Sequence, residues 1–182
     1  MATIYLLLSI VFRASVICGD PDPSPHLEQS PRESIAQTYL AEVGVREEGK
    51  NNHGAGPKKY LASVNLGEGY AWCAAFVKWV FKQNGISTGN ANAWSPSWFP
   101  EDKVIHRKGQ NSKVLPEKGD VFGLYYTNLK RIGHVGFVHE WSDDWVVTVE
   151  GNTNGDGSRD GDGVHKKRRL TKQIYVVSRY IT

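Results

Sequence analysis

The sequence predicts an α+β fold in which N-terminal helices pack on an antiparallel β-sheet. Apolar residues recur at helical spacing in the first half of the chain, whereas apolar and polar residues alternate in the second half. Helices that precede the strands, instead of alternating with them, indicate an antiparallel sheet. The chain has 182 residues, which is enough for one domain with its own core and too few for two.

Two helices are expected before residue 65. Residues 30–33 (SPRE) form a capping box with proline at the first helical position. Apolar residues at helical spacing follow over 35–43, and Gly44 is a suitable stop. A loop rich in Gly and Asn, residues 49–57, then leads to a short helix predicted over 58–64.

A third helix, predicted over residues 72–83, should be buried on nearly all sides. Only Lys78 and Lys82 interrupt its apolar residues, which leaves one narrow polar stripe. Cys73 lies in its first turn, directly after the turn at 67–69. The positive end of the helix dipole lowers the pKa of a thiol placed there. This position favours a nucleophile over an inert buried cysteine, which is the common alternative.

The second half of the chain predicts four strands, at residues 121–126, 132–141, 145–151 and 174–181. The middle two are expected to form a hairpin around Ser142-Asp143-Asp144. Together with the helices, these strands describe the sheet of the α+β fold.

The length of the hairpin loop decides which side chains share a face of the sheet. With a three-residue loop Trp141 pairs with Trp145, His134 lies opposite Asn152, and Glu150 is in diagonal reach of His134. A five-residue loop keeps this register. A two-residue turn at Asp143-Asp144 would move Glu150 to the other face, because the side chains alternate.

The predicted sheet face and the buried helix together supply a nucleophile, a base and a group that orients the base. These are Cys73, His134, and either Glu150 or Asn152. Along the chain the cysteine comes first, the histidine second and the carboxylate or amide third, which is the order in papain-like enzymes. A histidine satisfied within its strand is the alternative for His134, and it would be favoured if Cys73 were absent.

No metal or cofactor site is predicted. His139-Glu140 lacks a second histidine at helical spacing, so it is not a zinc motif. Residues 154–163 are rich in Asp and Gly but lack the regular spacing of a calcium loop, and a flexible loop is favoured there.

The N-terminus resembles an export signal. Residues 4–12 are an apolar run too short to span a bilayer, which predicts a signal peptide over 1–19, a linker over 20–29 and the folded domain over 30–182. No Lys or Arg precedes the run, which departs from the usual pattern. A lipoprotein signal with Cys18 as the lipidated residue, or a wrongly assigned start, are the alternatives.

The net charge of the chain and its tryptophan residues indicate which kinds of binding partner to expect. A net charge of +3 is too weak to argue for nucleic acid, although it tolerates an anionic polymer. Among the 6 Trp residues, Trp94 and Trp98 are candidates for stacking on sugar rings, with core packing as the equal alternative. The basic run 166–169 either faces an anionic polymer or forms a solvated strand edge.

Three segments, 70–77 (YAWCAAFV), 133–138 (GHVGFV) and 150–153 (EGNT), resemble the CHAP domain family of bacterial peptidoglycan hydrolases. The resemblance covers residues 32–182, and the motifs in this order are specific. It implies a papain-like fold, and we expect no cofactor. The catalytic residues that it implies are Cys73, His134, Glu150 and Asn152.

This resemblance implies an enzyme that cleaves an amide bond of peptidoglycan. The enzyme is then either an N-acetylmuramoyl-L-alanine amidase or an endopeptidase that cleaves a bond within the stem peptides or cross-bridges. With the N-terminal apolar run, we expect an exported monomer in the periplasm or outside the cell. The Cys73 backbone N–H and the Asn51 or Asn52 side chain are expected to form the oxyanion hole, and Tyr70 is expected to contact the substrate. A non-catalytic wall-binding module and a zinc amidase remain alternatives, which inhibition by iodoacetamide and insensitivity to chelators would separate from a thiol enzyme.

Overall fold

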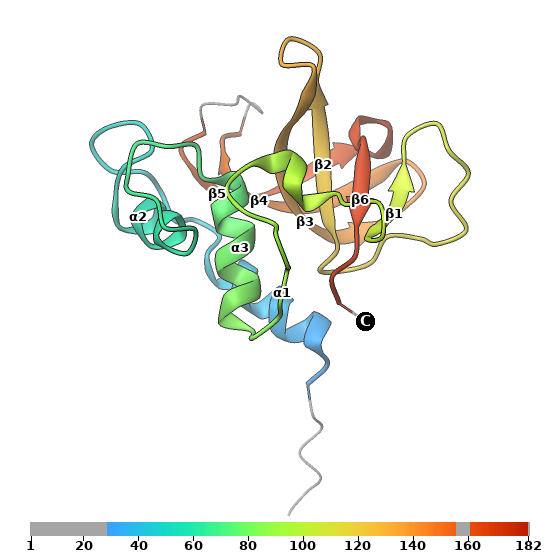
Figure 1. The fold of residues 1–182 in the computed structure, drawn as a ribbon, viewed down its shortest axis with the longest axis horizontal. Coiled ribbons are helices and arrows are strands. Elements are labelled where there is room, and N and C mark those ends of the chain that lie inside the picture. Colours follow the sequence, from blue (N-terminus) through green and yellow to red (C-terminus); the bar gives the residue numbers. More distant parts are fainter. Residues whose placement is uncertain (1–28, 156–160, 182) are drawn as a thin grey trace, which may run out of the picture.

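The structure, a computed structural model, describes residues 29–155 and 161–181 (Figure 1). Within them, helices precede a six-stranded sheet, as predicted. The helices are α1 (Pro31–Ala41), α2 (Ala55–Ala62), α3 (Cys73–Gln83) and the short 3₁₀ helices η1 (Ser95–Trp98) and η2 (Thr171–Gln173). The strands are β1 (Val104–Arg107), β2 (Val121–Tyr126), β3 (Arg131–Trp141), β4 (Trp145–Thr153), β5 (Gly163–Leu170) and β6 (Val176–Ser178).

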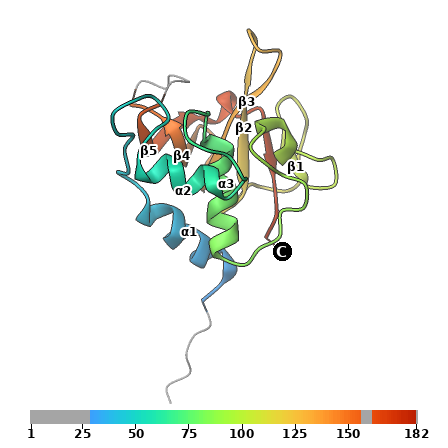
Figure 2. The ribbon, with the colours of Figure 1, turned by 60° about the vertical axis from the view of Figure 1, so that its left-hand side comes forward.

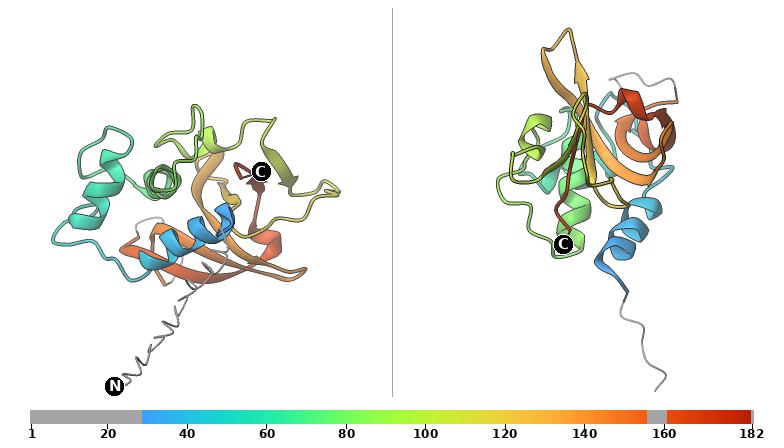
Figure 3. Two further views of the ribbon diagram at one scale, coloured as in Figure 1. Left: turned by 90° about the horizontal axis from the view of Figure 1, so that it is seen from below. Right: turned by 90° about the vertical axis from the view of Figure 1, so that its right-hand side faces the viewer.

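The sheet has the order β1-β6-β2-β3-β4-β5, and all of its neighbours are antiparallel. It is strongly twisted, and α1, α2 and α3 gather on one side of it (Figures 2 and 3). This arrangement confirms the predicted α+β class. In the described part of the chain no helix is both long enough and apolar enough to cross a membrane.

The predicted elements agree with the structure except at two strands. The Ser30 hydroxyl accepts a hydrogen bond from the Glu33 N–H and so caps α1. Strands β1 and β5 were not among the four predicted strands, although a solvated strand edge was one alternative for the basic run 166–169, and β5 is an edge strand of the sheet. β5 covers the basic run 166–169, where charged residues alternate between half-buried and exposed positions and hide the apolar pattern of a strand. The predicted signal over 1–19, with Cys18, and most of the linker over 20–29 lie outside the described residues.

Helix α3 is the centre of the core, as its apolar sequence predicted. Seven of its residues are buried, and Lys82 is exposed. Phe76 and Phe81 meet Phe137 of β3 with ring centroids 6.1 Å and 5.5 Å apart. The Trp72 ring stacks on Tyr60 of α2 at 5.2 Å. These contacts pack α3 against β3 in the middle of the sheet and hold Trp72, which precedes α3, against α2.

The hairpin differs from the prediction at its turn and agrees with it at its base. The Ser142 N–H donates to the Trp145 carbonyl at 2.9 Å, which makes Asp143-Asp144 a two-residue turn, so the expected three- or five-residue loop was wrong. A bulge between Val138 and Glu140 then shifts the register by one residue. Phe137 therefore pairs with Val149, as the predicted register requires. The two departures cancel.

Gly151 allows the close approach of β4 to α3. A Cβ atom at this position would lie 2.7 Å from the Trp72 ring and 2.8 Å from Phe76. Both neighbours are fully buried and cannot move freely. Gly136, on the neighbouring strand β3, is also closely surrounded. A Cβ atom at position 136 would lie 3.0 Å from the Cγ of Glu150 and 2.8 Å from the Val149 carbonyl oxygen.

Gly151→Ala is therefore expected to destabilise the fold by about 1–3 kcal/mol, because the added methyl group overpacks the core between β4 and α3. Denaturant-induced unfolding measures this loss. Gly67→Ala is the matched control, since its Cβ would meet nothing within 4 Å, and it should change the free energy of unfolding by less than about 0.5 kcal/mol. Equal effects of the two changes would contradict the close approach.

Candidate active site

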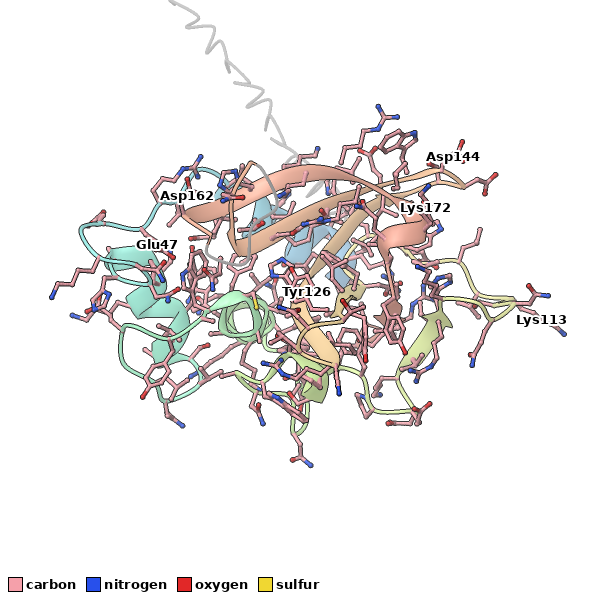
Figure 4. All side chains as sticks on the ribbon, turned by 90° about the horizontal axis from the view of Figure 1, so that it is seen from above. Glu47, Lys113, Tyr126, Asp144, Asp162 and Lys172 are labelled. Atoms are coloured by element: carbon pink, nitrogen blue, oxygen red, sulfur yellow. The ribbon has the colours of Figure 1, made fainter. Side chains whose placement is uncertain are left out.

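A cavity of about 90 Å³ opens where the start of α3 meets β3 and the end of β4. Figure 4 shows the molecule from above, with Tyr126, the last residue of β2, labelled. The cavity brings together three of the predicted residues, Cys73, His134 and Asn152. The remaining lining residues are Ala71, Ala93, Trp94, Ser95, Arg131 and Gly133.

Cys73 begins α3 and is buried. Its Sγ lies 3.7 Å from the Ser95 hydroxyl. Burial by itself raises the pKa of the Cys73 thiol. The hydrogen bond and charge of His134, together with the Ser95 hydroxyl and the Val135 backbone, outweigh burial and bring the pKa below its ordinary value.

His134 lies between Cys73 and a carboxylate. Its Nε2 is 2.8 Å from Oε2 of Glu150, which leaves the other ring nitrogen for Cys73. Burial lowers the pKa of His134, but the hydrogen bonds and charges of Cys73 and Glu150 raise it to about 9. A lowered thiol pKa and a raised imidazole pKa favour a thiolate–imidazolium pair at neutral pH.

Glu150 is a fully buried carboxylate with three hydrogen-bond partners. It accepts hydrogen bonds from His134, from the Thr148 hydroxyl and from Arg169. The Arg169 pair is bidentate, with both distances 2.6 Å. Burial raises the pKa of Glu150, but Arg169 first and His134 second hold it well below its usual range. Glu150 is thus the group that contacts the histidine.

Arg169 was missed from the sequence. It belongs to the basic run that was expected either to face an anionic polymer or to form a solvated strand edge. In the structure the side chains of β5 alternate between the two faces of the strand. His165, Lys167 and Arg169 are half-buried, whereas Lys166 and Arg168 are exposed. Nothing in the sequence paired Arg169 with Glu150, because that contact depends on the β4–β5 register.

Asn152 lines the cavity instead of contacting the Nε2 of His134. Its backbone is left-handed, with φ of 53°, a conformation that asparagine tolerates better than most residues. Its Oδ1 is buried and has no hydrogen-bond partner in the described structure. The choice between Glu150 and Asn152 that the sequence left open therefore falls to Glu150 for contact with the imidazole.

The aromatic residues that were expected to contact the substrate differ in how deeply they are buried. Trp94 is 57% exposed and lines the cavity, and Tyr70 is 58% exposed nearby in sequence. Trp98 is fully buried, stacks on Phe81 and donates its indole N–H to the Asn92 carbonyl. Trp98 therefore takes the alternative role, core packing, and cannot reach a substrate.

Asn51 and Asn52 do not line the cavity. They lie in the loop before α2, where the Asn52 backbone N–H donates to Glu47 at 2.7 Å. Glu47, labelled in Figure 4, also accepts from the Trp72 indole at 2.8 Å. The loop thus supports the residue that precedes Cys73. The polar group found beside the thiol is Ser95, which no sequence signal distinguished from other serines in turns.

The acidic loop over 154–163 is described only in part. Asp156 and Asp160 lie outside the described residues, and Asp162 accepts a hydrogen bond from His165 at 2.7 Å. Within the residues that the structure describes, no group of three or more His, Cys, Asp or Glu side chains could hold a metal ion.

The family comparison matches the part of the chain that holds these residues. Residues 65–152 match the CHAP domain. This segment is a CHAP domain. The CHAP family comprises amidases and peptidases of the papain-like superfamily, in general cysteine-dependent hydrolases. The matched segment runs from the loop before Cys73 to Asn152 and is narrower than the resemblance over 32–182. No curated protein matches the chain closely enough to be reported as a relative.

The pKa shifts predict a pH-dependent thiol reactivity. The rate of Cys73 alkylation by iodoacetamide should rise with pH around a midpoint below that of an ordinary thiol, about 8.5. In His134→Ala the midpoint should move upward, because burial then dominates. His106→Ala, which changes a half-buried histidine on β1, should leave the midpoint in place. A single rise centred at or above 8.5 in the native protein and unchanged in His134→Ala would indicate an inert buried cysteine.

Arg169→Gln should destabilise the protein by about 3 kcal/mol at neutral pH, because it leaves a buried carboxylate poorly compensated. The pKa of Glu150 is depressed in the folded state, so this stability is present above the ordinary carboxyl pKa of about 4.5 and is lost as the pH falls. The difference from the native protein should therefore shrink in acid. The measurement is urea-induced unfolding at pH 7 and at pH 3.5.

Arg168→Gln is the matched control for this change. Arg168 is exposed and lies 4.2 Å above the Trp145 ring, so its loss should cost no more than about 1 kcal/mol. Similar losses in the two variants, or a loss in Arg169→Gln that does not change with pH, would contradict the role of Arg169 as the partner of Glu150.

Proposed function

We propose that the protein hydrolyses an amide bond of peptidoglycan, with Cys73 as nucleophile and His134 as its acid and base. The contact that carries this proposal is the Nε2 of His134 on Glu150, which leaves the opposite side of the ring to Cys73. The CHAP family suggests peptidoglycan as the substrate. The arrangement supplies the nucleophile, base and orienting carboxylate that amide hydrolysis requires.

The reaction has two halves. The Cys73 thiolate attacks the amide carbonyl to form a tetrahedral intermediate, and the His134 imidazolium gives its proton to the departing amine as the C–N bond breaks. A thioester remains. Water, deprotonated by His134, attacks this thioester, releases the carboxylic acid and restores the thiolate–imidazolium pair.

The oxyanion of each tetrahedral intermediate needs hydrogen-bond donors. The backbone N–H of Cys73 lies at the start of α3, where N–H groups have no partner within the helix. The Ser95 hydroxyl, which lies beside Sγ, provides the second donor. Ser95 takes the role expected of Asn51 or Asn52, because it lines the cavity and they do not.

The scissile bond is either the amide between the glycan lactyl group and L-alanine or one within the peptides. Mass spectrometry of the fragments after digestion of purified peptidoglycan distinguishes them, since each cut leaves a different new amino terminus. We further propose that residues 30–182 act as one monomeric catalytic domain. Helix α1 and strands β5 and β6 lie outside the matched segment but share its core or its sheet.

Export follows from the substrate, because peptidoglycan lies outside the cytoplasmic membrane. The apolar run near the N-terminus supports this proposal as a cleaved signal, or as a lipid anchor through Cys18. Edman sequencing and mass measurement of the secreted protein would separate the two.

Cys73→Ala should reduce peptidoglycan hydrolysis by roughly a thousandfold or more while the fold survives. His134→Ala should reduce it similarly, and the double variant should be scarcely slower, because the two groups act as one unit. The assay is release of soluble fragments from purified peptidoglycan, with and without EDTA, and circular dichroism checks the fold. Turnover retained in Cys73→Ala, or abolished by EDTA in the native protein, would defeat the thiol mechanism.

A further inference from the structure

The cavity beside Cys73 contains a positive charge that the proposed chemistry does not use. Arg131 is its only lining residue with a permanent positive charge, and no Asp or Glu lines the cavity. Cys73, His134, Glu150 and Arg169 balance one another as two ion pairs. The charge of Arg131 is therefore added to a neutral set.

Arg131 is not used by the fold as an ion-pair partner. Over residues 29–155 and 161–181, no carboxylate lies within ion-pair distance of its guanidinium group. Its Nη1 donates to the Ile132 carbonyl at 2.9 Å. A guanidinium group carries five N–H donors in a planar fork, so most of this donor capacity remains for a ligand.

An irregularity in β3 brings Arg131 to the cavity. Leu124 pairs with His134 and Tyr125 pairs with Ile132, so Gly133 is an extra residue in the strand. Without this bulge, residues 131 and 134 would lie on opposite faces of the sheet. A Cβ at position 133 would lie 2.2 Å from the Tyr126 ring, so the bulge depends on glycine.

A second group in the cavity also lacks a partner. The Oδ1 of Asn152, whose residue is 3% exposed, accepts no hydrogen bond in the described structure. A buried acceptor of this kind is satisfied by a donor from a ligand, such as a peptide N–H. The cavity thus offers a cation and an N–H acceptor beside the thiol, with the exposed Trp94 ring at its rim.

We propose that Arg131 binds a free carboxylate of the substrate next to the scissile amide, while Asn152 accepts a neighbouring peptide N–H. The inference rests on the proposed function and specifies its substrate class as an acidic peptide in preference to its amidated form. A guanidinium–carboxylate pair has the geometry for two parallel hydrogen bonds, which a carboxamide cannot reproduce with the same charge.

The test uses one peptidoglycan preparation in two forms, untreated and with its carboxylates converted to carboxamides by carbodiimide and ammonia. The native protein should hydrolyse the untreated form about tenfold to a hundredfold faster, the value of one charge-assisted pair. Arg131→Gln should lose this preference by slowing on the untreated form alone. Arg131→Lys should keep part of it. Arg168→Gln, which removes an exposed charge remote from the cavity lining, should keep all of it.

Equal rates of the native protein on the two forms would overturn the inference, as would an Arg131→Gln variant that slows equally on both. If Arg131→Gln does not fold, the inference is tested by comparing the rates of the native protein and of Arg131→Lys on the two forms. A third outcome concerns the proposed function itself. If the native protein hydrolyses neither form, although a separate sample shows that its Cys73 reacts normally with iodoacetamide, the proposed function is overturned and the inference with it.

Discussion

A carboxylate buried in the sheet is the constraint around which this site is built. Glu150 has no exposed surface, so its charge is tolerated only because cations and donors surround it. Arg169 neutralises it from β5, and His134 contacts it from β3. Three adjacent strands must therefore be in register before the carboxylate is satisfied. Once they are, His134 has one position and faces Cys73.

Departures from regular strand geometry create the rest of the site. The bulge at Gly133 brings Arg131 and His134 to one cavity, and the bulge between Val138 and Glu140 restores the register that the short turn had shifted. Asn152 has a left-handed backbone at the end of β4. Irregular backbone at functional positions is common, because it aims side chains where regular pleating cannot.

The helix contributes position as much as polarity. The aromatic contacts of α3 with Phe137 and the absence of a side chain at Gly151 bring its first turn against β4. The Cys73 thiol is then close enough to His134 for the imidazole to outweigh burial, which alone would keep the thiol protonated. Core packing and thiol chemistry thus depend on the same few contacts.

The sequence by itself determined the α+β class, the buried helix that begins at Cys73 and the strands that carry His134 and Glu150, because these follow from local periodicity and caps. The tertiary structure decided what local patterns cannot encode. It selected Glu150 over Asn152 as the histidine partner, supplied Arg169 and Ser95, and moved Trp98 into the core. Each of these depends on a bulge, a strand register or a loop that brings distant residues together, and one extra residue in a strand reverses which face a side chain occupies.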